Sequence, residues 1–223
     1  MSKRGCSWFS AMVVAALLGA ARTAHAQSAA APALPVMLSR VGPAIVRVRR
    51  GAWWGTGFVF GSRHTIVTSY ELVNGPGALQ IVAADGVTRQ ARVRAWSPSD
   101  DLVVLEVEAD VAPESLPPAH QPLVAGMDAV MLYEPRDPQL SPATSGGWTS
   151  PLPRFSRVSR VSAAELDLDL TVWGLLGDDG AVVLSNSGEV LGIISRRTTK
   201  QRRTIVTRVE RIERLYQQLG KQG

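Results

Sequence analysis

The sequence predicts an all-β protein of two six-stranded antiparallel β-barrels, followed by a C-terminal α-helix. Three observations support this fold class. Short apolar or alternating runs separated by turn-forming residues recur along the chain, which is typical of antiparallel strands. A proline-rich segment, residues 110–122, divides these runs into two sets of six. The last residues instead carry apolar side chains at helical spacing.

The first 26 residues have the organisation of a signal peptide. Lys3 and Arg4 form a positive start, Ala11 to Ala21 form a short apolar run, and Ala24-His25-Ala26 matches an A-x-A cleavage site. The apolar run is too short to span a bilayer as a helix. We therefore expect a periplasmic or secreted protein with no stable membrane insertion after cleavage. An uncleaved anchor or a buried helix is the alternative.

Cleavage would change both charge and cysteine content. It removes three of the 24 basic residues, so the formal charge of +5 falls to +2 against 19 acidic residues. Such a small excess argues against a nucleic-acid-binding protein. Cys6, the single cysteine, would also be removed. Disulfides, thiol catalysis and cysteine-ligated zinc are then excluded, and no cofactor or metal is predicted.

Residues 27–40 are expected to be a disordered linker, because they are rich in small residues and proline. The first barrel is predicted over residues 41–112, with a hairpin turn at Asp85-Gly86 and a short helical turn at 72–75. Six strands in sequence can close a barrel and so leave no exposed edge. The predicted strands are 44–49, 56–61, 65–69, 78–83, 89–96 and 102–108.

The second barrel is predicted over residues 123–206, interrupted by a long loop at 135–153. A helix should follow over 207–219, with Thr207 and Glu210 as a capping box and Gly220 as its end. The predicted strands of this barrel are 129–133, 156–162, 167–173, 181–184, 190–195 and 204–206.

One loop carries the strongest functional signal. It reads Gly177-Asp178-Asp179-Gly180-Ala181-Val182 and is followed by Gly188-Glu189-Val190-Leu191-Gly192-Ile193. This stretch resembles the active-site loop of the HtrA (Deg) group of trypsin-like serine proteases. That group has Gly-Asn-Ser-Gly-Gly-Pro-Leu and then a hairpin with Gly-Glu-Val-Ile-Gly-Ile. The resemblance places Asp179 at the position of the catalytic serine and Gly177 at an oxyanion-hole position.

Two further segments are similar to the same family. The run Gly55-Thr56-Gly57-Phe58-Val59-Phe60, continued by Ile66 to Val73, resembles Gly-Ser-Gly-Phe-Val-Ile followed by Ile-Leu-Thr-Asn-Asn-His-Val-Val. Glu71 then stands at the catalytic histidine. The run Asp101-Leu102-Val103-Val104-Leu105 resembles Asp-Leu-Ala-Val-Leu, which places Asp101 at the catalytic aspartate. The order of the triad is kept as Glu71, Asp101 and Asp179.

The resemblance implies the trypsin-like, or chymotrypsin, fold without the catalytic residues. A glutamate with a reference pKa near 4.3 is too weak a base to deprotonate an alcohol at a useful rate, and position 179 holds no alcohol. The Asp179 carboxylate could instead accept hydrogen bonds from the oxyanion-hole amides. The two histidines beyond the signal peptide, His64 and His120, are expected on the surface. The chain ends soon after the helix, so the PDZ domains of many HtrA-type proteins are not expected.

Ser187 offers a rival alignment, because Asn186-Ser187-Gly188 also matches part of the family's Asn-Ser-Gly motif. Only two strands would then separate the nucleophile from the terminal helix, whereas the family has three. The alignment on Asp179 supplies all three. Residues 185–188 are therefore interpreted as a hairpin turn.

The predicted function is that of an exported protease homologue that binds a protein or peptide as a regulator or scaffold. Two alternatives remain open. One is an active hydrolase of altered mechanism that uses Glu71, Asp101 and Asp179 as acid and base. The other is a structural module stabilised by a cation, since crowded carboxylates either raise a pKa or bind a hard cation. Glu71 and Asp179 could equally face solvent or pair with arginines.

Overall fold

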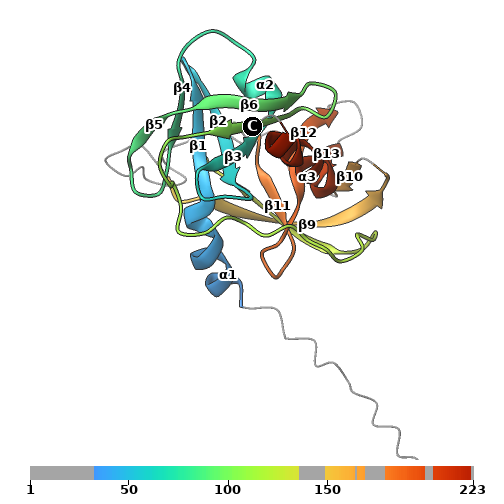
Figure 1. Ribbon diagram of the computed structural model, residues 1–223. Helices are drawn as coiled ribbons and strands as arrows, with labels where there is room; N and C mark the ends of the chain where they lie inside the picture. The colour runs from blue at the N-terminus through green and yellow to red at the C-terminus, as the bar shows by residue number, and fades with distance from the viewer. Residues whose placement is uncertain (1–32, 136–148, 164, 169–178, 199–202, 222–223) are drawn as a thin grey trace, which may run out of the picture. The chain divides into compact units, whose positions relative to one another are not determined.

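The computed structural model describes residues 33–135, 149–163, 165–168, 179–198 and 203–221, which fall within one compact unit spanning 31–223. Two curled antiparallel sheets make up most of it, with a short helix at the C-terminus (Figure 1). The predicted signal peptide lies outside the described residues.

The expected linker 27–40 is wrong in its second half. Residues Leu34–Val41 form helix α1, followed by a 3₁₀ turn at Gly42–Ala44. Pro35 lies in the first turn of α1, where its missing N–H costs no hydrogen bond. Met37 and Val41, four residues apart, are both buried. Burial of this apolar face stabilises a helix where the composition alone indicates a linker.

The first sheet has the strand order β5-β4-β1-β2-β3-β7-β6. Only Ala91 separates β5 from β6, and its amide donates to Leu79 of β4, so one bent strand continues from one edge of the sheet to the other. The predicted strand 89–96 is this bent strand, and the helical turn predicted at 72–75 is α2, Tyr70–Val73. The strands are β1 Ile45–Arg50, β2 Trp53–Val59, β3 Thr65–Thr68, β4 Leu79–Val82, β5 Thr88–Gln90, β6 Arg92–Ser97 and β7 Leu102–Glu106.

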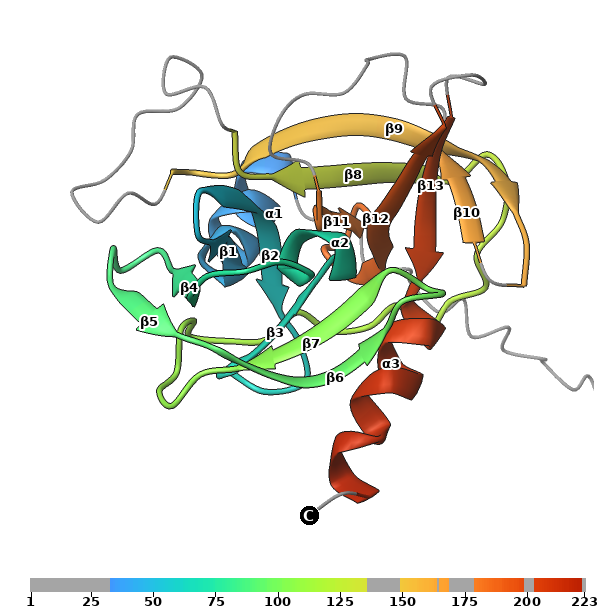
Figure 2. The ribbon, with the colours of Figure 1, turned by 90° about the horizontal axis from the view of Figure 1, so that it is seen from above.

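The second sheet is a closed barrel with the order β10-β13-β12-β11-β8-β9. Figure 2 shows it beside the first sheet, with β8 and β9 on the far side from β6 and β7. Five of the six predicted strands coincide with described strands. β10 begins two residues before the predicted strand 167–173, whose residues 169–173 lie outside the described residues, as do residues 136–148 of the predicted long loop. β9 begins four residues earlier than predicted, because Leu152 to Phe155 pair with β8. The strands are β8 Asp128–Tyr133, β9 Leu152–Val161, β10 Glu165–Leu168, β11 Val182–Leu184, β12 Val190–Thr198 and β13 Arg203–Arg208.

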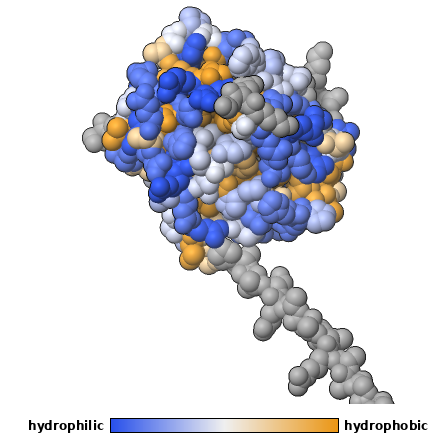
Figure 3. Space-filling view, in the orientation of Figure 1, coloured by the Kyte–Doolittle hydropathy of each residue, from blue (hydrophilic) through white to orange (hydrophobic). Residues whose placement is uncertain are grey.

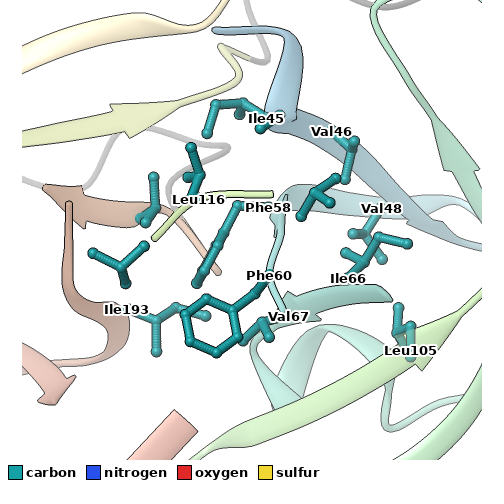
Figure 4. Packing of buried hydrophobic residues seen from close by; sticks show 14 of the residues in the cluster. Ile45, Val46, Val48, Phe58, Phe60, Ile66, Val67, Leu105, Leu116 and Ile193 are labelled. Carbon is teal, nitrogen blue, oxygen red and sulfur yellow. The ribbon is translucent and has the colours of Figure 1, made fainter. Parts of the chain in front are cut away.

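The larger buried core contains side chains from both sheets. Figure 4 shows Phe58 and Phe60 of the first sheet beside Leu116 of the crossover and Ile193 of β12. The crossover is itself attached to both sheets, through parallel bridges of Leu116 with Phe60 and of Pro118 with Val190. The shared core therefore fixes the position of one sheet relative to the other, and with it the residues that each sheet can contribute to a site.

Helix α3, Val209–Gln217, ends the fold and is followed by a 3₁₀ turn, Leu219–Lys221. Its buried residues, Val209, Ile212 and Leu215, have the predicted spacing. The predicted capping box is wrong. Thr207 belongs to β13 and its hydroxyl donates to the carbonyl of Asp100, so it is not available to cap the helix. Gly220 does not end the helix either, since it lies within the 3₁₀ turn.

The surface of the described part is largely hydrophilic, with separate hydrophobic patches on the face shown in Figure 3. Trp53, Trp96 and Phe155 are among the large apolar side chains exposed to solvent. Within the described ranges, no helix is long and apolar enough to cross a membrane.

Candidate functional site

Asp101 is the best-defined residue of the site predicted from the sequence. It immediately precedes β7, and the residue is buried, with 9% of its surface exposed. The Ser69 hydroxyl lies 2.9 Å from each carboxylate oxygen, and the backbone N–H of Glu71 donates to Oδ1 at 2.9 Å. Asp101 has a φ of 51°, a left-handed conformation that aspartate tolerates better than most residues. Its carbonyl accepts from the N–H of Tyr70.

Glu71 lies in α2, the short helix that follows β3, and its side chain is exposed. Its backbone, not its carboxylate, touches Asp101. In a catalytic triad the aspartate orients an imidazole through a hydrogen bond to its N–H. At this position the Asp101 carboxylate holds the backbone of α2 and the hydroxyl of Ser69 instead.

Asp179, which belongs to the second half of the chain, also lies close to Asp101. Its carbonyl accepts a 2.9 Å hydrogen bond from the N–H of Thr56 in β2. The neighbouring Gly180 has a φ of 79°, and a Cβ there would lie 2.1 Å from the carbonyl oxygen of Thr56. The loop thus packs directly against β2. Gly177, the predicted oxyanion-hole position, lies outside the described residues.

The electrostatics of the site centre on Asp101. Burial raises the pKa of its carboxyl above the ordinary value of 3.8, because the charged form loses hydration. Hydrogen bonds from the Glu71 amide and the Ser69 hydroxyl lower that pKa, while the negative charges of Glu71 and Asp179 raise it by smaller amounts. The structure thus brings all three predicted residues together, with Asp101 at the centre.

The hypothesis of three crowded, unpaired carboxylates needs correction. The Asp101 carboxylate is not unpaired, and burial raises its pKa more than repulsion does. In the part of the chain that the structure describes, no group of three or more acidic, histidine or cysteine side chains is arranged to hold a metal ion.

We expect Asp101→Asn to change how stability depends on pH. Because the pKa of Asp101 is raised in the folded state, its ionised carboxylate makes an unfavourable contribution to the stability of the protein. This contribution is largest above the folded pKa and disappears as pH falls through it. Asparagine keeps a carbonyl acceptor but has no charge. Relative to the wild type, the variant should therefore be more stable at pH 7 than near pH 4, close to the ordinary pKa. Urea denaturation at the two pH values measures the difference.

Asp128→Asn is the matched control, because Asp128 is an exposed aspartate on β8 that pairs with Arg157. The Asp128→Asn variant should not gain stability relative to the wild type as pH rises. Asp179→Asn should reproduce only a small part of the Asp101→Asn effect, since the charge of Asp179 contributes less than burial. An equal effect from both variants would restore the crowding hypothesis.

The rival alignment on Ser187 is wrong. Ser187 lies in the turn between β11 and β12, where the Gly188 N–H donates to the carbonyl of Ser185. Its hydroxyl lies 2.8 Å from a carboxylate oxygen of Glu189, and its carbonyl accepts from Arg40 of α1. This turn is the predicted hairpin. As expected, His120 is exposed, and the His64 side chain is 45% exposed and lies 3.7 Å from Asp110.

Two charged residues beside the site were missed by the sequence analysis. Glu134, immediately after β8, is fully buried, and its Oε1 lies 2.7 Å from Nη2 of Arg47 in β1. The same oxygen accepts two hydrogen bonds from Thr149, and the Glu134 N–H donates to Thr56. The Arg47 guanidinium stacks 4.0 Å from the ring centre of Trp54. In the sequence, Arg47 looks like an ordinary polar residue of a strand that alternates apolar and polar residues. Nothing in that pattern indicates a buried ion pair.

Comparison with known proteins places this geometry in a family. The family model of the trypsin-like peptidase domain matches residues 55–193, which is more than half of the chain. No curated protein matches the sequence.

Several solved structures are similar in fold. The serine endoprotease from Yersinia pestis has a TM-score of 0.70 and 17% identity, and the match covers 84% of this chain and 67% of that one. The Rv3671c protease from M. tuberculosis in its active form has a TM-score of 0.66 and 22% identity, and the match covers 86% and 88%. At these identities the likeness shows the fold alone. Together with the family match over residues that carry Asp101 and Asp179, it shows that the chain belongs to the trypsin-like peptidase domain family.

Proposed function

We propose that this chain is a degenerate HtrA-type member of the family, exported and catalytically inactive, which binds a protein or peptide. One observation carries the proposal. The residues that flank Asp101 at the positions of the catalytic histidine and serine are both acids, Glu71 and Asp179. Neither can act as the nucleophile or the base of the serine protease mechanism.

The hydrogen bonds of Asp101 support the same conclusion. In an active triad the aspartate stabilises the imidazolium that forms during the reaction. At this site the donors to Asp101 are a hydroxyl and a backbone amide, neither of which carries a proton that moves in catalysis. The carboxylate therefore acts as a structural acceptor that fixes α2 against β7.

Retention of the fold without the mechanism supports a role in binding. The core, the packing of Gly180 on β2 and the acceptor role of Asp101 are intact. A scaffold with such a preserved site and no nucleophile can hold a polypeptide without cutting it. Export is proposed from the sequence of residues 1–26.

The first test is reaction with a fluorophosphonate probe, which labels activated serines. We expect no labelling of the purified protein, with an active trypsin-fold protease as the positive control. Reduced casein should remain uncleaved, with no new termini found by mass spectrometry, while its association with the protein is measured by fluorescence anisotropy.

The outcomes separate the possible functions. Casein that binds and stays intact supports the proposal. Cleavage without probe labelling that is lost in Glu71→Gln or Asp101→Asn would favour a hydrolase of altered mechanism. Labelling of Ser185 or Ser187 would contradict the alignment on which the proposal depends.

A further inference from the structure

A pocket of about 310 Å³ opens at the end of β2 that lies away from Asp179. Gly55, beside Asp179, and Phe60, in the pocket, are five residues apart along extended chain, which corresponds to roughly 17 Å. The pocket is therefore separate from the site around Asp101. Its walls come from the end of β2, the proline-rich crossover and α3, and they include Phe60, Gly61, Ser115, Leu116, Glu213 and Tyr216.

The aromatic wall of the pocket is held in a defined position. The rings of Phe60 and Tyr216 meet edge to face, with centroids 6.0 Å apart and an interplanar angle of 85°. Tyr216 lies directly over Gly61, where a Cβ would come within 2.4 Å of the ring. Gly61 also has a φ of 73°. Glycine is therefore needed at this position for two reasons: the backbone turns through a positive φ, and the Tyr216 ring leaves no space for a Cβ.

Glu213 supplies a negative charge at this wall. It lies three residues before Tyr216 on α3, so the two side chains share one face of the helix. Within the described residues, its carboxylate has no ion pair or hydrogen bond, whereas Glu210 on the same helix is paired with Arg208. The pocket thus combines an aromatic ring, an apolar wall at Leu116 and an unpaired carboxylate.

We propose that this pocket binds the side chain of an arginine from a partner polypeptide. The planar guanidinium would stack on the Tyr216 ring and donate to the Glu213 carboxylate, and its aliphatic stem would lie along Leu116 and the adjacent prolines. Elsewhere in the described residues arginines lie over aromatic rings in the same way, Arg47 over Trp54 and Arg154 at 4.9 Å from the ring centre of Tyr133. Binding of arginine in this pocket would be independent of whether the site around Asp101 is catalytic.

The probe for this site is N-acetyl-arginine methylamide, titrated to millimolar concentration into ¹⁵N-labelled protein. We expect saturable shifts of the backbone amides of Gly61, Leu116 and Tyr216. N-acetyl-citrulline methylamide has nearly the same shape without the charge. It should bind about tenfold more weakly, because charge-assisted hydrogen bonds are the stronger ones.

Glu213→Gln should weaken binding of the arginine probe about tenfold, while Glu108→Gln, a change at an exposed acid outside the pocket, should leave it unchanged. Both positions are at least partly exposed, so an unchanged spectrum elsewhere verifies the fold of each variant. Equal binding of the citrulline probe, no response to Glu213→Gln, or shifts centred on Glu71 and Asp179 would each overturn the proposal.

Discussion

Replacement of Arg47 by methionine is expected to destabilise the protein by about 3–5 kcal/mol, the usual cost of removing one partner from a buried ion pair. Glu134 is fully buried and only 14% of the Arg47 side chain is exposed. Within the described residues, Glu134 Oε2 already lacks a hydrogen-bond partner. Without Arg47, a buried carboxylate would keep only its two hydrogen bonds from Thr149.

The pH dependence of this variant follows from the pKa of Glu134. Burial raises that pKa, while the Arg47 guanidinium and Thr149 lower it. Loss of Arg47 should therefore raise it further, since the largest opposing interaction disappears. The destabilisation is expected to be greatest at neutral pH and to diminish as pH falls through the raised pKa, because protonation removes the buried charge.

A double-mutant cycle over Arg47→Met and Glu134→Gln tests this explanation. Arg47→Met with Glu134→Gln should be more stable than Arg47→Met alone, because the buried charge is gone while an acceptor for Thr149 remains. Arg157→Met is the matched control. It breaks an exposed pair with Asp128 and should cost no more than about 1 kcal/mol. Equal unfolding midpoints for Arg47→Met and Arg157→Met in urea would show that the buried pair stabilises the protein no more than the exposed pair does.

Gly180→Ala is expected to destabilise the protein through two separate effects. A φ of 79° costs a residue other than glycine about 1–3 kcal/mol if the conformation is kept. The added Cβ would also lie 2.1 Å from the Thr56 carbonyl oxygen and 2.4 Å from Oγ1 of Thr68. Since Thr68 already donates to that carbonyl at 2.7 Å, neither atom can withdraw without breaking a buried hydrogen bond. The loop that carries Asp179 must then move away from β2.

Two other glycines separate these effects. Gly126 has a φ of 91° and nothing within 4 Å of a Cβ, so Gly126→Ala measures backbone strain alone. Gly75 has neither a positive φ nor a close neighbour, so Gly75→Ala is the baseline. We expect the loss of stability to increase from Gly75→Ala through Gly126→Ala to Gly180→Ala, measured by urea denaturation. A Gly180→Ala variant no less stable than Gly126→Ala would mean that the Asp179 loop is not packed on β2.

Local sequence patterns determined where most strands lie. Alternating apolar residues and glycine-containing turns are short-range properties, so most of the strands occur close to their predicted places. The alignment of Glu71, Asp101 and Asp179 also came from the sequence, because each position is attached to a motif of several residues. The errors occur where distant residues compete for a local group, as when Asp100 takes the Thr207 hydroxyl that was predicted to cap α3.

Only the tertiary structure decided what surrounds those residues. Ser69 reaches Asp101 across 32 residues of sequence, and the N–H of Glu134 reaches Thr56 across 78. The burial that raises the pKa of Asp101 and encloses Glu134 with Arg47 depends on how the two sheets pack, which no short window of sequence records. By itself the sequence determined the strands and the identities of the acids at the triad positions. Hydration, pKa and hydrogen-bond partners depend on distance in space, and the fold alone set them.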